Sequence, residues 1–552
     1  MPPRAPIASL DTHEVTNQPP PLGGYNLFDR DPILRAALDR EGAGWAEDQA
    51  RAFGAALGED RVRDLADDAN HHPPELTAFD RFGHRLDEVV YHPAYHALMA
   101  LAKRHRVHAI AWTAGRPGGH VAHMALEYML VQAEPGVCCP ITMTHAAVPA
   151  LRRSADLASQ WEPGILAAAY DPRFIPASEK RGLTIGMAMT EKQGGSDLRA
   201  TATRARALGG GDYALTGHKW FCSAPMSDAF LTLAQTEGGP TCFLAPRWRP
   251  DGGRNPFLIQ RLKDKLGDRA NASAEIEYKD TWARAVGAEG EGVRAIIEMV
   301  HQTRLDTALA AAGMMRQAVV EAVHHAAHRR AFQRPLINQP LMRNVLADLV
   351  VDWVAATVMV ARVARAFDSP GDPFARIAVA VAKYWINKRL PNHVYEAMEC
   401  LGGNGYVEDG PMPRLYREAP VNSIWEGSGN VICLDVLRAM DRAPGALDAF
   451  IAELDAAAGG DRHLDRAVAR LKDDLAASKK TDATREIGAR RLVEAMALAL
   501  QGALVVRFAP PAVADAYCAS RLGGDWGRAL GTLPTGVAFD PIIDLGRIEG
   551  AG

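Results

Sequence analysis

The sequence lacks several features that would assign it to a common class of protein. Its seven cysteines form no CxxC pairs, so we expect free thiols in a reducing compartment rather than a disulfide framework. The formal net charge of −4 gives no overall attraction to nucleic acid, so any DNA binding would need a local basic surface. No G-x-G-x-x-G fingerprint and no internal repeat occur, which argues against a nicotinamide-binding Rossmann domain.

Long apolar runs are also missing. The first ten residues contain no apolar core of the kind found in signal peptides. The longest apolar run, near residues 495–506, is interrupted by Gln501 and is too short to span a bilayer. We therefore expect a cytoplasmic protein that makes no membrane contact.

The pattern of apolar residues predicts an α+β protein of four domains. At 552 residues and 48% apolar content, the chain can bury a large core and is long enough for several domains. Helical periodicity dominates at both ends, whereas short β-branched and aromatic runs separated by glycine and proline turns lie between them. The expected parts are a helical domain (1–180), a β-barrel-like domain (181–287), a helical bundle (288–444) with long helices at 293–328, 340–367 and 374–400, and a C-terminal helical extension (445–552).

One segment, P-V-N-S-I-W-E-G-S-G-N over residues 420–430, places a carboxylate, Glu426, in a tight polar turn. Desaturation of an acyl thioester needs one positioned base and one flat electron acceptor, and such a turn could supply the base. Gly427 and Gly429 let the backbone approach a cofactor, and Ser428 and Asn430 offer hydrogen bonds. Taken alone, the segment is more often a glycine-rich loop with a solvated glutamate.

Two further segments favour the flavin interpretation. Residues 187–197 read M-A-M-T-E-K-Q-G-G-S-D after an apolar run, and residues 217–223 read G-H-K-W-F-C-S inside a strand-rich stretch. In order, spacing and residue type the three segments resemble the acyl-CoA dehydrogenase family. Longer matches, such as C-P-I-T-M-T from Cys139 and R-L-K-D-K-L-G from Arg261, resemble its AidB-type branch, which is linked to DNA alkylation damage.

The resemblance implies an FAD cofactor and assigns site residues. It makes Glu426 the catalytic base and Arg304 a substrate contact, and Thr303 excludes a second base beside Arg304. Flavin contacts from the loop, the strand and the final turn would be Met187, Met189, Thr190, Gly195, Ser196, Phe221, Cys222, Ser223, Ile424, Trp425, Gly427, Ser428 and Asn430. Arg329, Phe332, Gly402 and Gly403 would reach the flavin of a neighbouring subunit. Cys222 is better explained as a packing residue than as a redox nucleophile, and Gly402 and Gly403 could also be a simple helix stop.

The C-terminal extension carries a possible basic stripe. Arg462, Arg466 and Arg470 fall four residues apart on one helical face. Acidic residues are interleaved with them, and mixed charge of this kind is usually an ordinary solvated face. In the AidB-type branch the extra domain is associated with double-stranded DNA, so the stripe and Arg438 are candidate DNA contacts, with Arg438 alternatively pairing within its helix.

No metal site is predicted, because His324 and His328 lie four apart on a helix without an evident third ligand. Two functions remain open. The first is dehydrogenation of a short or branched acyl-CoA by a homotetramer, with an electron-transferring flavoprotein or oxygen as acceptor. The second is protection of DNA by a flavoprotein with little turnover.

Overall fold

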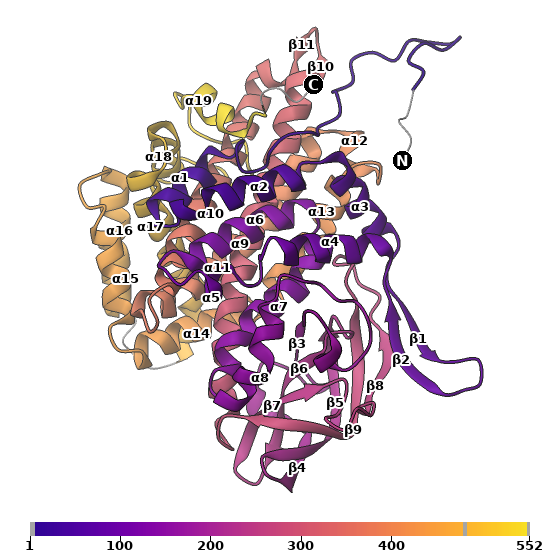
Figure 1. Cartoon of the computed structure of the whole chain (residues 1–552). Helices are drawn as coiled ribbons and strands as arrows, with labels where there is room; N and C mark the ends of the chain where they lie inside the picture. The colour runs from indigo at the N-terminus through magenta and orange to yellow at the C-terminus, as the bar shows by residue number, and fades with distance from the viewer. Residues whose placement is uncertain (1–5, 478–482, 549–552) are drawn as a thin grey trace.

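The computed structural model describes residues 6–477 and 483–548. The first part of the chain is mainly helical and packs along one side of the central helices (Figure 1). Helix α1 begins at Pro32 because Asp31 accepts a hydrogen bond from the Leu34 amide at 2.8 Å and proline suits the first helical position. The helices are α1 (Pro32–Arg40), α2 (Glu47–Leu57), α3 (Asp60–His71), α4 (Pro93–Arg104), α5 (Ile110–Thr113), α6 (Gly119–Ala133), α7 (Pro135–Leu151) and α8 (Ala155–Ile165).

The sequence had suggested a purely helical domain here, but this part of the chain also contains two strands. Strands β1 (Glu75–Phe79) and β2 (Arg85–Val90) form an antiparallel hairpin between α3 and α4. Its turn is folded by Asp80, whose carboxylate accepts the amides of Phe82 and His84, both at 2.8 Å. Asx turns of this kind are local, and the two strands are too short to interrupt the helical pattern clearly.

The middle of the chain forms a seven-stranded sheet, drawn at the lower end of Figure 1. Its order is β3-β6-β4-β5-β9-β7, β8 adds to β9, and a β6–β7 pairing closes the sheet on itself, which gives the barrel-like domain that was predicted. The register of β5 against β9 places Ser223 opposite Ser273. The strands are β3 (Ile185–Ala188), β4 (Arg204–Gly209), β5 (Asp212–Ser223), β6 (Ala229–Thr236), β7 (Gly239–Pro246), β8 (Phe257–Leu262) and β9 (Ser273–Val286).

Three long helices, α9 (Gly292–His328), α10 (Pro340–Phe367) and α11 (Pro373–Cys400), form the centre of the molecule. Between α9 and α10 the short strands β10 (Arg330–Ala331) and β11 (Arg334–Pro335) make a hairpin. Helices α12 (Gly403–Tyr406), α13 (Met412–Glu418) and α14 (Gly429–Arg442) follow. Within the described residues, α10 is the one helix long and apolar enough to cross a membrane, and 89% of its most apolar window is buried inside the protein.

The C-terminal extension packs against this bundle on one side (Figure 1). Its helices are α15 (Ala446–Asp455), α16 (Arg462–Ala477), α17 (Ala483–Phe508), α18 (Pro511–Tyr517) and α19 (Phe539–Ile543). Helix α16 is amphipathic and buries Leu464, Val468, Leu471 and Leu475. Helix α17 packs against both α10 and α11.

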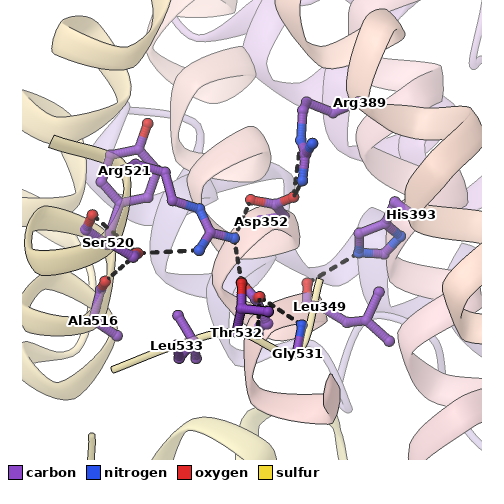
Figure 2. A network of polar contacts seen from close by, with 12 residues as sticks. Leu349, Asp352, Arg389, His393, Ala516, Ser520, Arg521, Gly531, Thr532 and Leu533 are labelled. Atoms are coloured by element: carbon purple, nitrogen blue, oxygen red, sulfur yellow. Dashed lines mark hydrogen bonds and ion pairs between the residues drawn. The ribbon is translucent and has the colours of Figure 1, made fainter. Parts of the chain in front are cut away.

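A buried ionic network fastens the extension to the bundle (Figure 2). Arg521 pairs with Asp348 and, at 2.8 Å, with Asp352 on α10, and Arg389 on α11 binds the other oxygen of Asp352 at 2.6 Å. The Gly531 amide donates to Asp348 at 2.8 Å. Because each carboxylate has a cation or an amide facing it, these contacts offset the large cost of removing the charges from water.

Candidate active site around Glu426

Glu426 lies in the turn between a 3-10 segment (Ala419–Ser423) and helix α14. Its backbone is left-handed, with φ +56°, and the next residue, Gly427, has φ +102°. A left-handed glutamate costs about 1 kcal/mol or more and persists only where surrounding contacts enforce it. The contacts that enforce this turn come from α9 and α11.

Thr303 on α9 holds the carboxylate itself. Its hydroxyl lies 2.6 Å from Glu426 Oε2 and 3.1 Å from the Val300 carbonyl oxygen. The hydroxyl proton can therefore go to the carboxylate when Glu426 is ionised, or to Val300 when Glu426 is protonated and donates to Thr303. Both protonation states of a base at this position are satisfied by the same side chain.

Two cations hold the backbone of the turn. Lys383 on α11 donates to the Trp425 carbonyl at 2.8 Å and to the Gly427 carbonyl at 2.5 Å. Arg304 Nε donates to the Glu426 carbonyl at 3.2 Å, while its Nη1 pairs with Asp435 at 2.8 Å. The predicted substrate residue Arg304 is thus buried and engaged inside the protein, and its contact with substrate stays a prediction.

Burial raises the pKa of Glu426, and the Thr303 hydrogen bond and the positive charges of Lys383 and Arg304 act in the opposite direction. These are the opposing influences that can bring a carboxyl group close to neutral pH, where a general base works best. Glu426 is only half-buried as a residue, so a substrate could still reach it.

The loop predicted to hold a flavin is ordered by a buried carboxylate. Glu191 accepts hydrogen bonds from the Thr203 hydroxyl at 2.6 Å and the Ala202 amide at 2.7 Å, and pairs with Lys219 at 2.8 Å. The Trp220 amide donates to the Thr190 carbonyl at 2.7 Å, so the loop is fixed to β5. Thr190 and Gly195 lie at the folded part of this loop, and Ser196 is exposed.

Strand β5 offers both an exposed ring and a hydroxyl. Phe221 is 51% exposed, whereas Cys222 points into the core, where burial raises the pKa of its thiol. Ser223 lies 3.3 Å from the hydroxyl of Ser273. Cys222 therefore packs as a protonated thiol, and Phe221 and Ser223 remain available to a ligand.

The structure brings the three sequence segments together around one apolar cluster. Met187, Met189 and Trp425 all pack against a cluster that contains Cys139 and Ala224. Burial raises the pKa of the Cys139 thiol. The charge of Glu426 also acts to raise this pKa, and a hydrogen bond with Ser223 acts to lower it. Residues more than 200 positions apart, Ser223 and Glu426, thus face the same region from the sheet and from the bundle.

The other predicted cofactor residues lie elsewhere. Phe332, 92% exposed, and the half-buried Arg329 belong to the β10–β11 hairpin, which Figure 1 shows at the end of the molecule opposite the sheet. Gly402 and Gly403 are exposed beside α12, with no neighbouring atom where a Cβ would sit. These four residues are therefore not assembled with Thr190 and Ser223 within one chain.

The N-terminus of α14 has the character of an anion site. Ser428 and Asn430 are exposed, and no side chain caps the helix. Lys388 and Arg490 flank Gly429, where a Cβ would approach the Lys388 side chain to 3.0 Å and Arg490 to 3.3 Å, and Arg490 donates to Asn430 at 2.8 Å. Two cations at the positive end of a helix are unfavourable without an anion. The diphosphate of FAD fits this arrangement, and the exposed Ile424 lies just before it.

Three of these contributors were not identified as site residues from the sequence: Lys383, Lys388 and Arg490. For Lys383 a signal was present, since a single lysine interrupts the apolar stretch I-A-V-A-V-A-K-Y-W. For Arg490 there was none, because its partner Asn430 is 60 residues away on a different helix.

The predicted DNA contacts occupy an exposed face. Arg462, Arg466 and Arg470 project from α16 on the side opposite its buried leucines. Within the described residues, none of the three forms an ion pair. Arg438 is exposed on α14 and lies 3.3 Å from Asp435, as expected if it pairs within its own helix.

Two groups of histidines in the described part of the chain are not arranged as metal ligands. His324 and His328 each contact a backbone carbonyl oxygen, that of Pro20 at 2.8 Å and that of His324 at 2.9 Å. A buried group that the sequence did not indicate, His123, His145 and Asp306, has its ligand atoms within 4.8 Å of one another. The two rings stack at 3.7 Å with an interplanar angle of 10°, so their lone pairs lie in parallel planes and do not converge on one ion.

Comparison with known proteins defines the class. Three family models match the chain in order: the AidB N-terminal domain of the adaptive response proteins over residues 17–172, the acyl-CoA dehydrogenase middle domain over 186–281 and the acyl-CoA dehydrogenase C-terminal domain over 290–440. The chain belongs to the acyl-CoA dehydrogenase family, a family of FAD-dependent oxidoreductases.

Individual relatives show to which branch of this family the chain belongs. The AidB protein of Escherichia coli (strain K12) is 46% identical over 513 residues, which cover 92% of this chain and 94% of that protein. Acyl-CoA dehydrogenase family member 11 of Caenorhabditis elegans is 30% identical over 83% of this chain and 77% of that protein. This similarity over nearly the whole length assigns the chain to the AidB-type branch.

Solved structures agree with this assignment. Caenorhabditis elegans ACDH-11 in complex with C11-CoA superimposes with a TM-score of 0.84 at 26% identity, over 95% of each chain. Butyryl-CoA dehydrogenase from Megasphaera elsdenii matches with a TM-score of 0.58 at 20% identity, over 76% of this chain and 99% of that one, and shows the shared fold alone.

Proposed function

We propose that the protein catalyses α,β-dehydrogenation of a short or branched acyl-CoA, with Glu426 as the base that removes the α proton. The observation that carries the proposal is the Glu426 turn. Its backbone is left-handed at Glu426, and Thr303 holds the carboxylate at 2.6 Å. The carboxylate faces the same apolar cluster as Ser223. Acyl-CoA as the class of substrate is supported by the C11-CoA complex of the nematode structure.

The residues of this chain hold and orient the base and accept the proton. Thr303, Lys383 and Arg304 hold the carboxylate and its turn, so that the proton passes from the α carbon to Glu426 without a large rearrangement. FAD, when bound, accepts the hydride that leaves the β carbon. The apolar cluster around Cys139 and Trp425 excludes water, which strengthens the electrostatic contacts within the site.

The proposed FAD contacts divide between two subunits. On one chain we propose as FAD contacts Met187, Met189, Thr190, Gly195, Ser196, Phe221, Ser223, Ile424, Trp425, Gly427, Ser428 and Asn430, together with the backbone of Cys222, whose side chain is buried in the core. Phe332, Gly402 and Gly403 are exposed and Arg329 is half-buried, all away from these contacts, as residues that serve a neighbouring subunit would be. We therefore propose a cytoplasmic homotetramer that delivers electrons to an electron-transferring flavoprotein or to oxygen.

The first test is an anaerobic titration of the flavoprotein with a panel of acyl-CoA thioesters, followed by the loss of flavin absorbance. We expect rapid bleaching in the wild type and none in Glu426→Gln. Glu418→Gln is a matched control, because Glu418 is a buried carboxyl eight residues earlier that bonds the Asp268 amide instead of the site. Equal bleaching in wild type and Glu426→Gln would refute the assignment of the base.

A second function, binding of double-stranded DNA, is supported by the basic stripe on α16. Asp461 caps the helix by accepting the His463 amide at 2.7 Å, and Asp465 accepts the Gly459 amide at 3.0 Å. Two of the interleaved acidic residues are thereby engaged in local structure, while the three arginines point outward. Contacts of this type would be made to phosphates and would be independent of sequence.

Duplex binding measured across a salt series tests this function. Arg462→Ala combined with Arg466→Ala should reduce the slope of log affinity against log salt by about 2, one for each lost phosphate contact. Arg81→Ala, at an exposed arginine on the distant β1–β2 hairpin, is the control. Binding that is absent, or unaffected by the double substitution, would count against the α16 stripe.

A further inference from the structure

Lys383 is a buried lysine beside the base. It projects from α11 with only 1% of its surface exposed, and its ammonium group bridges the carbonyls of Trp425 and Gly427, the residues on either side of Glu426. Taking a lysine out of water costs several kcal/mol. Two backbone carbonyls could be satisfied by a neutral amide at lower cost, so the hydrogen bonds alone do not explain a charged residue here.

The charges around Lys383 indicate its function. Burial lowers the pKa of Lys383 to about 7, Glu426 acts to raise it, and Arg304 and Lys388 act to lower it. Arg304 is already paired with Asp435, which Arg376 also binds at 2.9 Å, and Lys388 is exposed. On the remaining side Glu426 faces Thr303 and the Cys139 thiol, which are uncharged. Glu426 is therefore the carboxylate that the Lys383 charge acts on.

We propose that Lys383 is a positioning residue that sets the ionisation of the base as well as the shape of its turn. A protonated lysine close to a carboxylate favours the ionised form of that carboxylate, and the carboxylate in turn favours the protonated lysine. Lys383 opposes the rise in the pKa of Glu426 that burial causes, so that a larger fraction of Glu426 can accept a proton at a given pH. This inference rests on the proposed role of Glu426, and it makes a separate prediction about pH.

Loss of the charge and loss of the hydrogen bonds can be separated by substitution. Lys383→Met removes both, whereas Lys383→Gln keeps an amide donor and removes the charge, and Lys383→Arg keeps a charge. Without the charge the pKa of Glu426 should rise by about one unit or more. For a rise of one unit, flavin reduction by thioester should be about fivefold slower than in the wild type at a pH one unit below the new pKa, and it should recover at high pH, where the base is ionised again.

Lys103 is a matched control. It is fully buried, donates to the carbonyls of Ile165 and Leu183, both at 3.0 Å, and burial lowers its pKa to about 7 as well. It differs in lying beside Lys180 and Asp228 rather than Glu426. Lys103→Met should reduce thermal stability to a similar extent as Lys383→Met, and it should leave the pH dependence of flavin reduction unchanged.

The experiment combines the pH profile of anaerobic flavin reduction with an infrared titration of the Glu426 carboxyl band, taken as the difference between each variant and its Glu426→Gln counterpart. A rise in the carboxyl pKa in Lys383→Met and Lys383→Gln, reversed in Lys383→Arg, would support the proposal. An unchanged carboxyl pKa, or a rate that falls equally at every pH, would overturn it and leave Lys383 as a structural clamp.

The infrared titration does not depend on turnover. If no thioester reduces the flavin in the wild type, the proposed reaction fails, yet the carboxyl pKa of Glu426 still reports whether Lys383 controls it. Failure of the proposed function and failure of the Lys383 proposal are thus distinguishable.

Discussion

Substitution of Thr303 by valine probes the hydrogen bond that holds the base. The Thr303 hydroxyl donates to Glu426 Oε2 at 2.6 Å, and a hydrogen bond to a charged group contributes about 1.5–3 kcal/mol. Protonated Glu426 also bonds Thr303, but through a neutral hydrogen bond that contributes about 0.5–1.5 kcal/mol, so the ionised form gains about 1–1.5 kcal/mol more from this hydroxyl. Because one pKa unit corresponds to 1.36 kcal/mol, loss of the hydroxyl should raise the pKa of Glu426 by about 1 unit. Valine keeps the branched shape, so packing changes little apart from the lost hydroxyl.

The sign of the effect follows from which form of Glu426 the hydroxyl stabilises. Burial already holds the pKa of Glu426 above its usual value, and the Thr303 bond opposes that rise. Without it, a larger fraction of Glu426 is protonated at neutral pH and cannot accept the α proton. The rate of anaerobic flavin reduction by the best thioester of the panel should therefore fall by up to about 10-fold on the acidic side of the pH profile and recover as pH rises.

Thr307→Val is the matched control. Thr307 lies one turn further along α9, is buried, and donates its hydroxyl to the Thr303 carbonyl at 2.6 Å. Thr307→Val should lower the free energy of unfolding by a similar amount without shifting the pH profile of flavin reduction. Thr303→Ser, which keeps the hydroxyl, should have the wild-type profile. The reasoning is refuted if Thr303→Val and Thr307→Val shift the profile equally, or if neither shifts it.

Four further predictions concern stability and cofactor retention. Arg521→Met leaves Asp348 and Asp352 buried with one cation fewer, and should lower the free energy of unfolding by about 3–5 kcal/mol in a urea titration at pH 7. Glu191→Gln leaves Lys219 buried without its carboxylate, so FAD should be lost faster on dialysis, measured by the ratio of flavin to protein absorbance. Since its hydrogen bonds and Lys219 hold the pKa of Glu191 below its usual value despite burial, the wild type should retain FAD above the usual pKa of a glutamate and lose it as pH falls below. Gly195→Ala would place a Cβ 2.3 Å from the Thr190 hydroxyl, which should displace the loop and also release FAD.

The controls for these predictions are specific. Gly488→Ala introduces a methyl group on α17 where nothing lies within 4 Å, and it should leave FAD retention unchanged. A loss below about 1 kcal/mol for Arg521→Met would show that Arg389 alone compensates the two aspartates. Full FAD retention in Glu191→Gln at neutral pH would mean that the hydroxyl and amide contacts of the loop suffice without the charge.

The sequence predicted the class of fold, which the structure confirms, and it predicts Glu426 as the base. The long helices could be predicted because apolar spacing and proline at the first turn are local signals: residues 340–367 were expected as a helix, and α10 has the same bounds. The α+β fold and the family were likewise confirmed. The β1–β2 hairpin was missed because its strands are five and six residues long, too short to stand out within a helical region.

The surroundings of the base were decided by tertiary structure alone. Thr303 is 123 residues from Glu426 in sequence, and Lys383 is 42 residues from Trp425. No local pattern indicates that two separate helices will direct a hydroxyl and an ammonium group at one turn, since those directions depend on how α9 and α11 pack. The sequence by itself therefore predicts Glu426 as the base, and the packing of the bundle decides which side chains surround it.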